Sequence, residues 1–319
     1  MPKHYRHLRL ENRHTISALC KLGMSFREIA EETGFNETTI SREIARNSGE
    51  RGYRPEQAHK KSLERRVKSR RSRVVIGDMK VEVEAKLRDF HSPEQINGQL
   101  KKEGFKAPSH QAIYDYVARD RKAGGDLFRS LRHGGKRYRR RHTKGEGRGK
   151  IPARTGIEER PVSAKNRTRY GHWEADLVEG AKGTGFVLSL YEMKTQTYLV
   201  SKLPDKKAET VSEAIVRKLS GWKVRSVTYD NGLEFSGHLE VGRELMAPSY
   251  FCNPYCSWEK GGVENGNGLL RQYLPKGMSF EDVDDELLSG IEEEINERPR
   301  KNLGYKCPMD YLPKLLTVA

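Results

Sequence analysis

The C-terminal half of the chain changes from helical periodicity to runs of β-branched and aromatic residues that alternate with helical segments. WEADLVE predicts one strand, GFVLSLYEMKTQTYLVSKL predicts two strands with a turn near residues 193–196, and KVRSVTYDNG predicts a fourth strand. Between them, KKAETVSEAIVRKL has Val211, Ile215 and Leu219 at helical spacing. This order predicts an α/β domain over residues 161–300, and such folds usually place their chemistry at strand ends.

Three acidic residues fall in or beside the predicted elements of this domain. Asp176 lies in the first strand, Asp230 directly follows the last strand, and Glu264 is separated from Asp230 by thirty-three residues. A lone Asp after a strand is usually a cap or turn residue, and DNG is itself a turn signal. Three carboxylates brought together, however, can hold two divalent cations that drive attack on a phosphodiester, and their hard oxygens suit Mg²⁺ or Mn²⁺ better than zinc. Four nearby glutamates compete for the same role: Glu174, Glu179, Glu234 and Glu259.

The charge of the chain indicates its partner. The 319 residues carry a formal net charge of +16, with a pI of about 9.6. A positive charge of this size draws a protein toward polyanions, and neutralised phosphates would supply much of the affinity. A basic protein without a special partner is the alternative.

Membrane and secretion signals are absent from the sequence. No apolar run approaches the roughly 18 residues that span a bilayer, and the N-terminus lacks the apolar stretch of a signal peptide. We therefore expect a cytoplasmic protein in a reducing compartment, which the four cysteines fit. Cys252 and Cys256 have no second Cys/His pair nearby at zinc-finger spacing, so we expect no structural zinc.

Residues 1–62 carry the pattern of a helix-turn-helix DNA-binding domain. A first helix ends at Gly23, and Ser25 with Glu28 forms a capping box for FREIAEET. Gly34 ends that helix, and Asn36 caps ETTISREIARN, whose Ile40 and Ile44 face inward. The N-terminal residues of this second helix would enter the major groove, where Arg42 would grip guanine. The candidate contacts are Glu37, Thr38, Thr39, Ser41, Arg42 and Arg46. A helical hairpin whose polar residues meet only solvent is the alternative.

A second helical module is predicted over residues 78–125, between a basic linker at 63–77 and a basic, Gly-rich linker at 126–160. Ser92 and Pro93 open its first helix, and Ser109 opens another with Ile113, Tyr116 and Val117 on one face. The module is either a second helix-turn-helix or a protein-contact module. The basic runs at 65–73 and 136–141 either contact phosphates or remain solvated.

Long segments resemble the DDE transposases of bacterial insertion sequences, specifically the IS30 family. The resemblance rests on GHWEADLVEG, TYDNGLEF, NPYCSWEKGGVENGNGLLRQYLPKG and NERPRKNLGYKCPMDYL, and it extends to REIAEETGFNETTISREIARN and SPEQINGQLKKEG. It implies a metal-bound triad, which by motif is Asp176, Asp230 and Glu264. The expected fold class is multidomain, with all-α helix-turn-helix modules, an α/β ribonuclease H-like catalytic domain and a tail at residues 301–319.

Two basic residues near Glu264 are candidate DNA contacts. Arg271 lies seven residues after Glu264, two helical turns on and so on the same face, where it would clamp a phosphate. A salt bridge from Arg271 to a surface carboxylate is the alternative. Lys260 is the other candidate DNA contact.

The resemblance implies a transposase that binds terminal inverted repeats and uses divalent metal to cut double-stranded DNA and join it to a target. Two Mg²⁺ ions, or Mn²⁺, would activate the nucleophile and stabilise the leaving 3′-oxygen, with Asp176 bridging both. Because two DNA ends must be brought together, we expect a homodimer or a larger homo-oligomer associated with the bacterial nucleoid. The helix around LLSGIEEEINERP either contributes to assembly or packs on the catalytic core.

Two other functions remain open at this point. A sequence-specific DNA-binding regulator with an inoperative catalytic domain would explain the charge and the helix-turn-helix, although not three acids in their motif contexts. A ribonuclease H that cuts RNA–DNA hybrids would explain the acids, although not the two DNA-reading modules.

Overall fold

The computed structural model describes residues 7–68, 75–134, 151–254 and 256–317. The chain divides into two compact units, Met1–Val74 and Val75–Ala319. Most of the predicted basic run at 65–73, and all of the run at 136–141, lie outside the described residues. No helix in the parts of the chain that the structure describes is long and apolar enough to cross a membrane.

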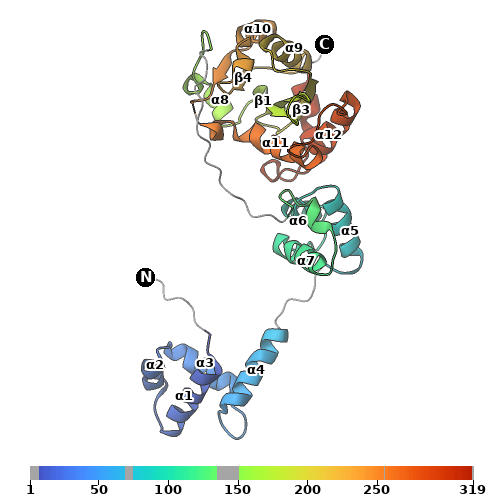
Figure 1. Cartoon of the computed structure of the whole chain (residues 1–319). Coiled ribbons are helices and arrows are strands. Elements are labelled where there is room, and N and C mark those ends of the chain that lie inside the picture. The colour runs from blue at the N-terminus through green and yellow to red at the C-terminus, as the bar shows by residue number, and fades with distance from the viewer. Residues whose placement is uncertain (1–6, 69–74, 135–150, 255, 318–319) are drawn as a thin grey trace. The chain divides into compact units, whose positions relative to one another are not determined.

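In residues 7–68, the described part of the first unit, the helices are α1 (Leu10–Lys21), α2 (Phe26–Thr33), α3 (Glu37–Asn47) and α4 (Pro55–Lys68) (Figure 1). The predicted caps are confirmed, because Ser25 forms a capping box with Glu28, Gly34 ends α2 in the left-handed conformation, and the Asn36 side chain accepts from the backbone N–H of Thr38. Helix α4 runs to Lys68, past the predicted domain end at residue 62.

The core of the first unit is small and is supplemented by a buried ion pair. Ile16, Ile29 and Ile40 are fully buried, one from each of the first three helices. Arg13 of α1 donates to Glu43 of α3 at 2.7 Å, and both side chains are about nine-tenths buried or more. This pair fixes α1 against α3 with a geometry that apolar packing alone does not specify.

The second unit begins with a helical module of α5 (Gly77–Arg88), α6 (Pro93–Lys102), α7 (His110–Lys122) and the 3-10 turn η1 (Leu127–Ser130). Ser92 caps α6 and Ser109 caps α7, as predicted. Ile113 and Val117 of α7 are buried in the core of the module, while Tyr116 is half-buried at its edge. The module therefore has its own hydrophobic core.

The rest of the second unit is built on a five-stranded sheet of order β3-β2-β1-β4-β5. β2 runs antiparallel to both of its neighbours, whereas β1, β4 and β5 run parallel. The strands are β1 (His172–Glu179), β2 (Phe186–Glu192), β3 (Tyr198–Leu203), β4 (Ser226–Tyr229) and β5 (Ser249–Phe251). The four predicted strands are confirmed; β5 was not predicted.

Helices cover both faces of this sheet (Figure 1). One face packs against α9 (Ala208–Leu219) and α10 (His238–Glu244), and the other against α11 (Gly261–Tyr273) and α12 (Asp285–Glu297). Leu288, Ile291 and Ile295 of α12 are buried in that second core, so this helix packs on the catalytic part, as expected. The remaining short elements are α8 (Val162–Lys165), η2 (Ile157–Glu159), η3 (Leu233–Phe235), η4 (Ser257–Lys260), η5 (Lys301–Leu303), η6 (Pro308–Tyr311) and α13 (Leu312–Leu315).

The alternation of side chains along β1 decides which face of the sheet carries the predicted acid Asp176. Trp173 and Ala175 point into the core under α9, so Glu174 and Asp176 point to the face covered by α11. Parallel pairing of β1 with β4 brings the end of β4, and with it Asp230, to the same region. The sheet thus places two of the three predicted acids beside one helix.

Candidate active site

Asp176 is the centre of the site and is held from both sides by residues of α11 and its N-cap. Asn267 donates its amide to Asp176 Oδ2 at 2.7 Å, and Lys260 Nζ lies 3.3 Å from Asp176 Oδ1. The Tyr198 hydroxyl donates to Asn267 Oδ1 at 2.7 Å, which leaves the Asn267 NH₂ group directed at the carboxylate. Burial raises the pKa of Asp176, and the repulsion of Asp230 adds to that, while Lys260 opposes the shift.

Asp230 is positioned by the turn that ends β4. Its Oδ1 accepts from the backbone N–H of Gly232 at 2.9 Å, and its Oδ2 lies 3.8 Å from Lys260 Nζ. Asn231 fixes this turn because its side chain donates to the Cys252 carbonyl at 2.7 Å and accepts from Arg154. The predicted turn at DNG therefore serves to hold Asp230 beside Asp176.

Glu264 is an exposed residue in the first turn of α11. It comes four residues after Lys260, the N-cap of this helix, and three before Asn267, and both of those residues contact Asp176. Helical spacing therefore predicts that Glu264 lies on the side of α11 that faces the aspartates. Among the described residues, no three Asp, Glu, His or Cys side chains are gathered tightly enough to hold a metal ion.

The competing glutamates have other roles where the structure gives their partners. Glu174 is 1% exposed and accepts from the backbone N–H of Val263 at 2.8 Å, so it anchors the first turn of α11 to β1. Glu259 accepts from the backbone N–H of Asn253 at 2.8 Å. Both carboxylates fix the loop and helix that carry Glu264, and neither is directed at Asp176.

The two basic candidates beside Glu264 make contacts within the protein. Lys260 has a side chain that is only 4% exposed and turned toward the aspartates. Arg271 is half-buried and donates to the backbone carbonyls of Glu179 at 2.7 Å and Leu274 at 3.3 Å, which joins α11 to the end of β1. The DNA contacts expected of both residues stay predictions.

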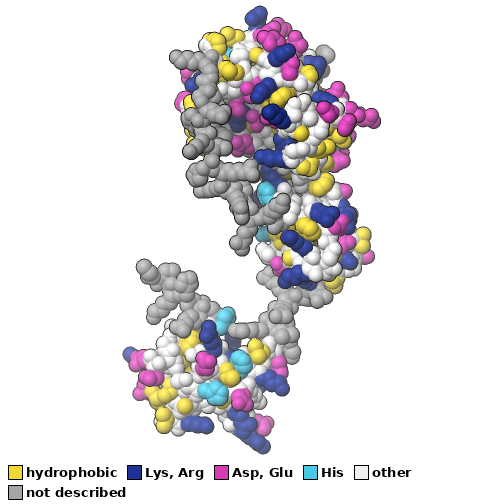
Figure 2. Space-filling model, viewed as in Figure 1, with side chains coloured by type: hydrophobic (Ala, Val, Ile, Leu, Met, Phe, Trp, Pro, Cys, Tyr) yellow, Lys and Arg dark blue, Asp and Glu magenta, His cyan; other side chains and the backbone are white. Residues whose placement is uncertain are grey.

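The helix-turn-helix candidates divide by exposure. Thr38, Arg42 and Arg46 are exposed, whereas Thr39 and Ser41 are half-buried. The Thr38 hydroxyl also donates to Asn36 Oδ1 at 2.8 Å, so this side chain takes part in the helix cap. Figure 2 shows Lys and Arg side chains spread over both units among Asp and Glu. Arg42 is thus the exposed candidate placed in the middle of α3.

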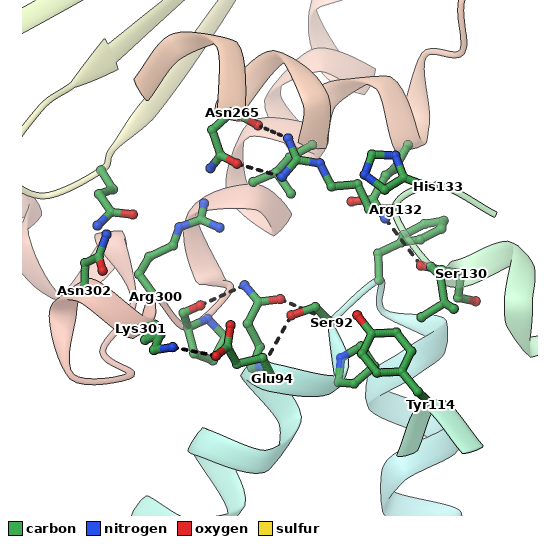
Figure 3. Close-up of a pocket in the computed structure, with 18 residues that line it drawn as sticks. Ser92, Glu94, Tyr114, Ser130, Arg132, His133, Asn265, Arg300, Lys301 and Asn302 are labelled. Carbon is green, nitrogen blue, oxygen red and sulfur yellow. Dashed lines mark hydrogen bonds and ion pairs between the residues drawn. The ribbon is translucent and has the colours of Figure 1, made fainter. Parts of the chain in front are cut away.

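The second helical module is joined to the catalytic part along α11. Arg132, after η1, donates to Asn265 Oδ1 at 2.6 Å and to the Asn265 carbonyl at 3.0 Å, one residue beyond Glu264. Gln95 of α6 donates to the Pro299 carbonyl at 2.8 Å. Between these contacts lies a cavity of about 590 Å³ (Figure 3). The sequence predicted neither the seam nor the cavity, because each contact joins residues more than a hundred positions apart.

One further exposed residue near the site was given no role from the sequence. Trp258, in η4 before Lys260, is 71% exposed, while Trp173 is fully buried. This exposed indole stands two residues before the lysine that contacts both aspartates.

Comparisons with known proteins agree with the helix-turn-helix of the first unit. Residues 4–47 match a family model described as a helix-turn-helix domain. The chain is 38% identical to the transposase for insertion sequence element IS4351 of Bacteroides fragilis, over 98% of this chain and 97% of that one. It is 33% identical to the transposase InsI for IS30A of Escherichia coli strain K12, over 97% of this chain and 84% of that one.

The structural comparison includes the catalytic core domain of BIV integrase, with 19% identity and a TM-score of 0.37, covering 45% of this chain and 93% of that one. The predicted fold class is confirmed, with helical modules ahead of an α/β catalytic part. Near-complete coverage at more than 30% identity shows that this chain belongs to the IS30 family of insertion-sequence transposases, DNA-binding proteins with a helix-turn-helix domain, here ahead of an α/β catalytic part.

Proposed function

We propose that this transposase binds the terminal inverted repeats of its element and cuts and joins DNA at Asp176, Asp230 and Glu264 with divalent metal. The observation that carries the proposal is that Asp176 is contacted by Lys260 and Asn267, which stand four residues before and three residues after Glu264 at the start of α11, with Asp230 beside the same lysine. Carboxylate oxygens are the ligands that Mg²⁺ and Mn²⁺ prefer, so the donor set fits the metal. Bound there, two such ions supply activation of the attacking oxygen and stabilisation of the leaving 3′-oxygen.

The chain's own residues prepare this site. Asp176, Asp230 and Glu264 would hold the ions. Asn267 and Tyr198 fix the rotamer of Asp176, which is the role that outer hydrogen bonds play around metal ligands. Glu174 and Arg271 hold α11, the helix that carries Glu264, against β1.

Cleavage by the wild-type protein should depend on the metal and on Asp176. On a labelled duplex that carries the element's terminal repeat, Mg²⁺ should give 3′-hydroxyl ends and joined products, and EDTA should give none. Asp176→Asn should lower the cleavage rate roughly 10³-fold or more, because the isosteric amide lacks the anionic oxygen that would hold divalent metal. Tight repeat binding without product from the wild-type protein, in Mg²⁺ and in Mn²⁺, would favour the regulator instead, and cleavage of RNA–DNA hybrids alone would favour a ribonuclease H.

Arg42 is proposed to read a base pair of the repeat through the major groove. Arg42→Ala should weaken repeat binding by about 1–3 kcal/mol and relax the preference at one base pair, because a bidentate contact to guanine is lost. Arg46→Ala is the matched comparison, since a phosphate contact at the C-terminal turn of α3 would weaken binding to all sequences equally. A binding assay on wild-type and point-substituted repeats measures both. Equal losses on every sequence for both variants would contradict base reading by Arg42.

Two ends of an element must be cut and joined together, so the working form is proposed to be at least a dimer. The enzyme would act on double-stranded DNA in the bacterial cytoplasm, at the nucleoid.

A further inference from the structure

Lys260 places a buried positive charge between two acids of the site. Its Nζ donates to the Ala175 carbonyl at 2.8 Å and lies 3.3 Å from Asp176 Oδ1 and 3.8 Å from Asp230 Oδ2. The residue is 3% exposed. A buried ammonium needs charged partners, and the two carboxylates supply them.

Two carboxylates this close to one cation would repel each other without it. Asp176 has a further partner in Asn267, and Asp230 in the backbone N–H of Gly232, but both of these are neutral donors. Removing a buried charge while leaving its partners is strongly unfavourable. Lys260 is thus the cation that balances this pair among the described residues that contact it.

The same oxygens are needed for divalent metal. Lys260 approaches Oδ1 of Asp176 and Oδ2 of Asp230, the carboxylate oxygens that the two neutral donors leave open. The ammonium and a metal ion cannot both bind these two oxygens fully at the same time. Each therefore weakens the binding of the other. The lysine is anchored by the Ala175 carbonyl, so it remains at the edge of the site when its carboxylate contacts loosen.

We propose that Lys260 is a positioning residue that holds Asp176 and Asp230 together before metal binds and competes with the metal for their oxygens. This inference rests on the proposed function of the two aspartates as metal ligands. Lys260 then has two opposite effects, because it stabilises the metal-free fold and weakens the affinity of the site for metal. A residue that merely fills space would have neither a metal-dependent effect nor a dependence on the charge of Asp230.

Thermal unfolding of the full chain separates these effects. In EDTA, Lys260→Met should lower the Tm of the catalytic unit by roughly 4 °C or more. Addition of Mn²⁺ should raise the Tm of this variant more than that of the wild type, with a half-saturating concentration roughly tenfold lower. Asp230→Asn, combined with Lys260→Met, should restore much of the lost Tm in EDTA, because the repulsion is removed. Lys202→Met is the matched control, since the Lys202 ammonium donates to the Glu281 carbonyl at the surface.

The outcomes divide clearly. An unchanged Tm for Lys260→Met in EDTA would overturn the proposal, as would a loss of Tm that neither Asp230→Asn nor Mn²⁺ reduces. If Lys260→Met yields no folded protein, recovery of folded protein by Asp230→Asn supports the proposal and failure to recover it overturns it. A wild-type Tm that responds to neither Mg²⁺ nor Mn²⁺ would contradict the metal site itself, and the EDTA comparison with Asp230→Asn would still decide whether Lys260 positions the pair.

Discussion

Glu264→Gln is expected to abolish strand cleavage and joining while leaving repeat binding intact. The substitution keeps the size and the helical position of the side chain but removes the charge that holds metal. We expect a loss of roughly 10³-fold or more in the cleavage rate, as for other residues that act as one catalytic unit. Binding to the repeat should change by less than about twofold, because the helix-turn-helix belongs to the other compact unit.

Glu179→Gln is the matched control for this prediction. Glu179 is also an exposed glutamate beside the site, at the end of β1, and its backbone carbonyl, which accepts from Arg271, is unaffected by the change. Strand cleavage and gel-shift binding should be measured on the same protein preparations. Cleavage at the wild-type rate by Glu264→Gln, or an equal loss of cleavage in Glu179→Gln, would contradict a specific role of Glu264 as the third acid. The competing glutamates would then be the candidates for that role.

Local signals in the sequence predicted much of the fold, because they act through neighbouring residues. The capping box of Ser25 and Glu28 and the cap of Asn36 locate helix starts without knowledge of the rest of the chain. The run WEADLVE likewise predicted β1, and the DNG turn predicted where β4 ends. The acids at these elements were therefore identified from the residues around them.

Local sequence signals do not predict contacts between segments that lie far apart in the chain. The short strand β5 has three residues and carries almost no periodic signal of its own. Lys260 looks like a surface base in sequence, and its burial follows from β1 and β4 lying side by side, which spacing does not reveal. The contact between Arg132 and Asn265 joins the second helical module to the catalytic part, which the sequence composition had divided from it. Only the fold shows that both belong to one compact unit.

A substitution that disturbs the packing of α11 on the sheet is expected to have the second large effect on cleavage and stability. Two glycines let this helix approach the strands closely. A Cβ at Gly266 would lie 2.5 Å from the ring of Tyr198, and a Cβ at Gly262 would lie 2.3 Å from the ring of Tyr191. Both rings are buried in the core beneath α11, so neither can rotate away freely. Any side chain at these positions must push the helix outward.

Gly266→Ala should therefore be destabilising and nearly inactive, although alanine is the better helix former. Overpacking of this kind costs about 1–3 kcal/mol, which exceeds the gain of about 1 kcal/mol in helix propensity. The displaced helix would carry Glu264 and Asn267 away from Asp176, and a shift of about 1 Å at a catalytic group costs on the order of 10²-fold in rate. Gly261→Ala is the control, because a Cβ there meets nothing within 4 Å. Gly261→Ala should keep wild-type cleavage and melt no lower, whereas wild-type cleavage and Tm in Gly266→Ala would mean that the close approach of α11 does not position the catalytic acid.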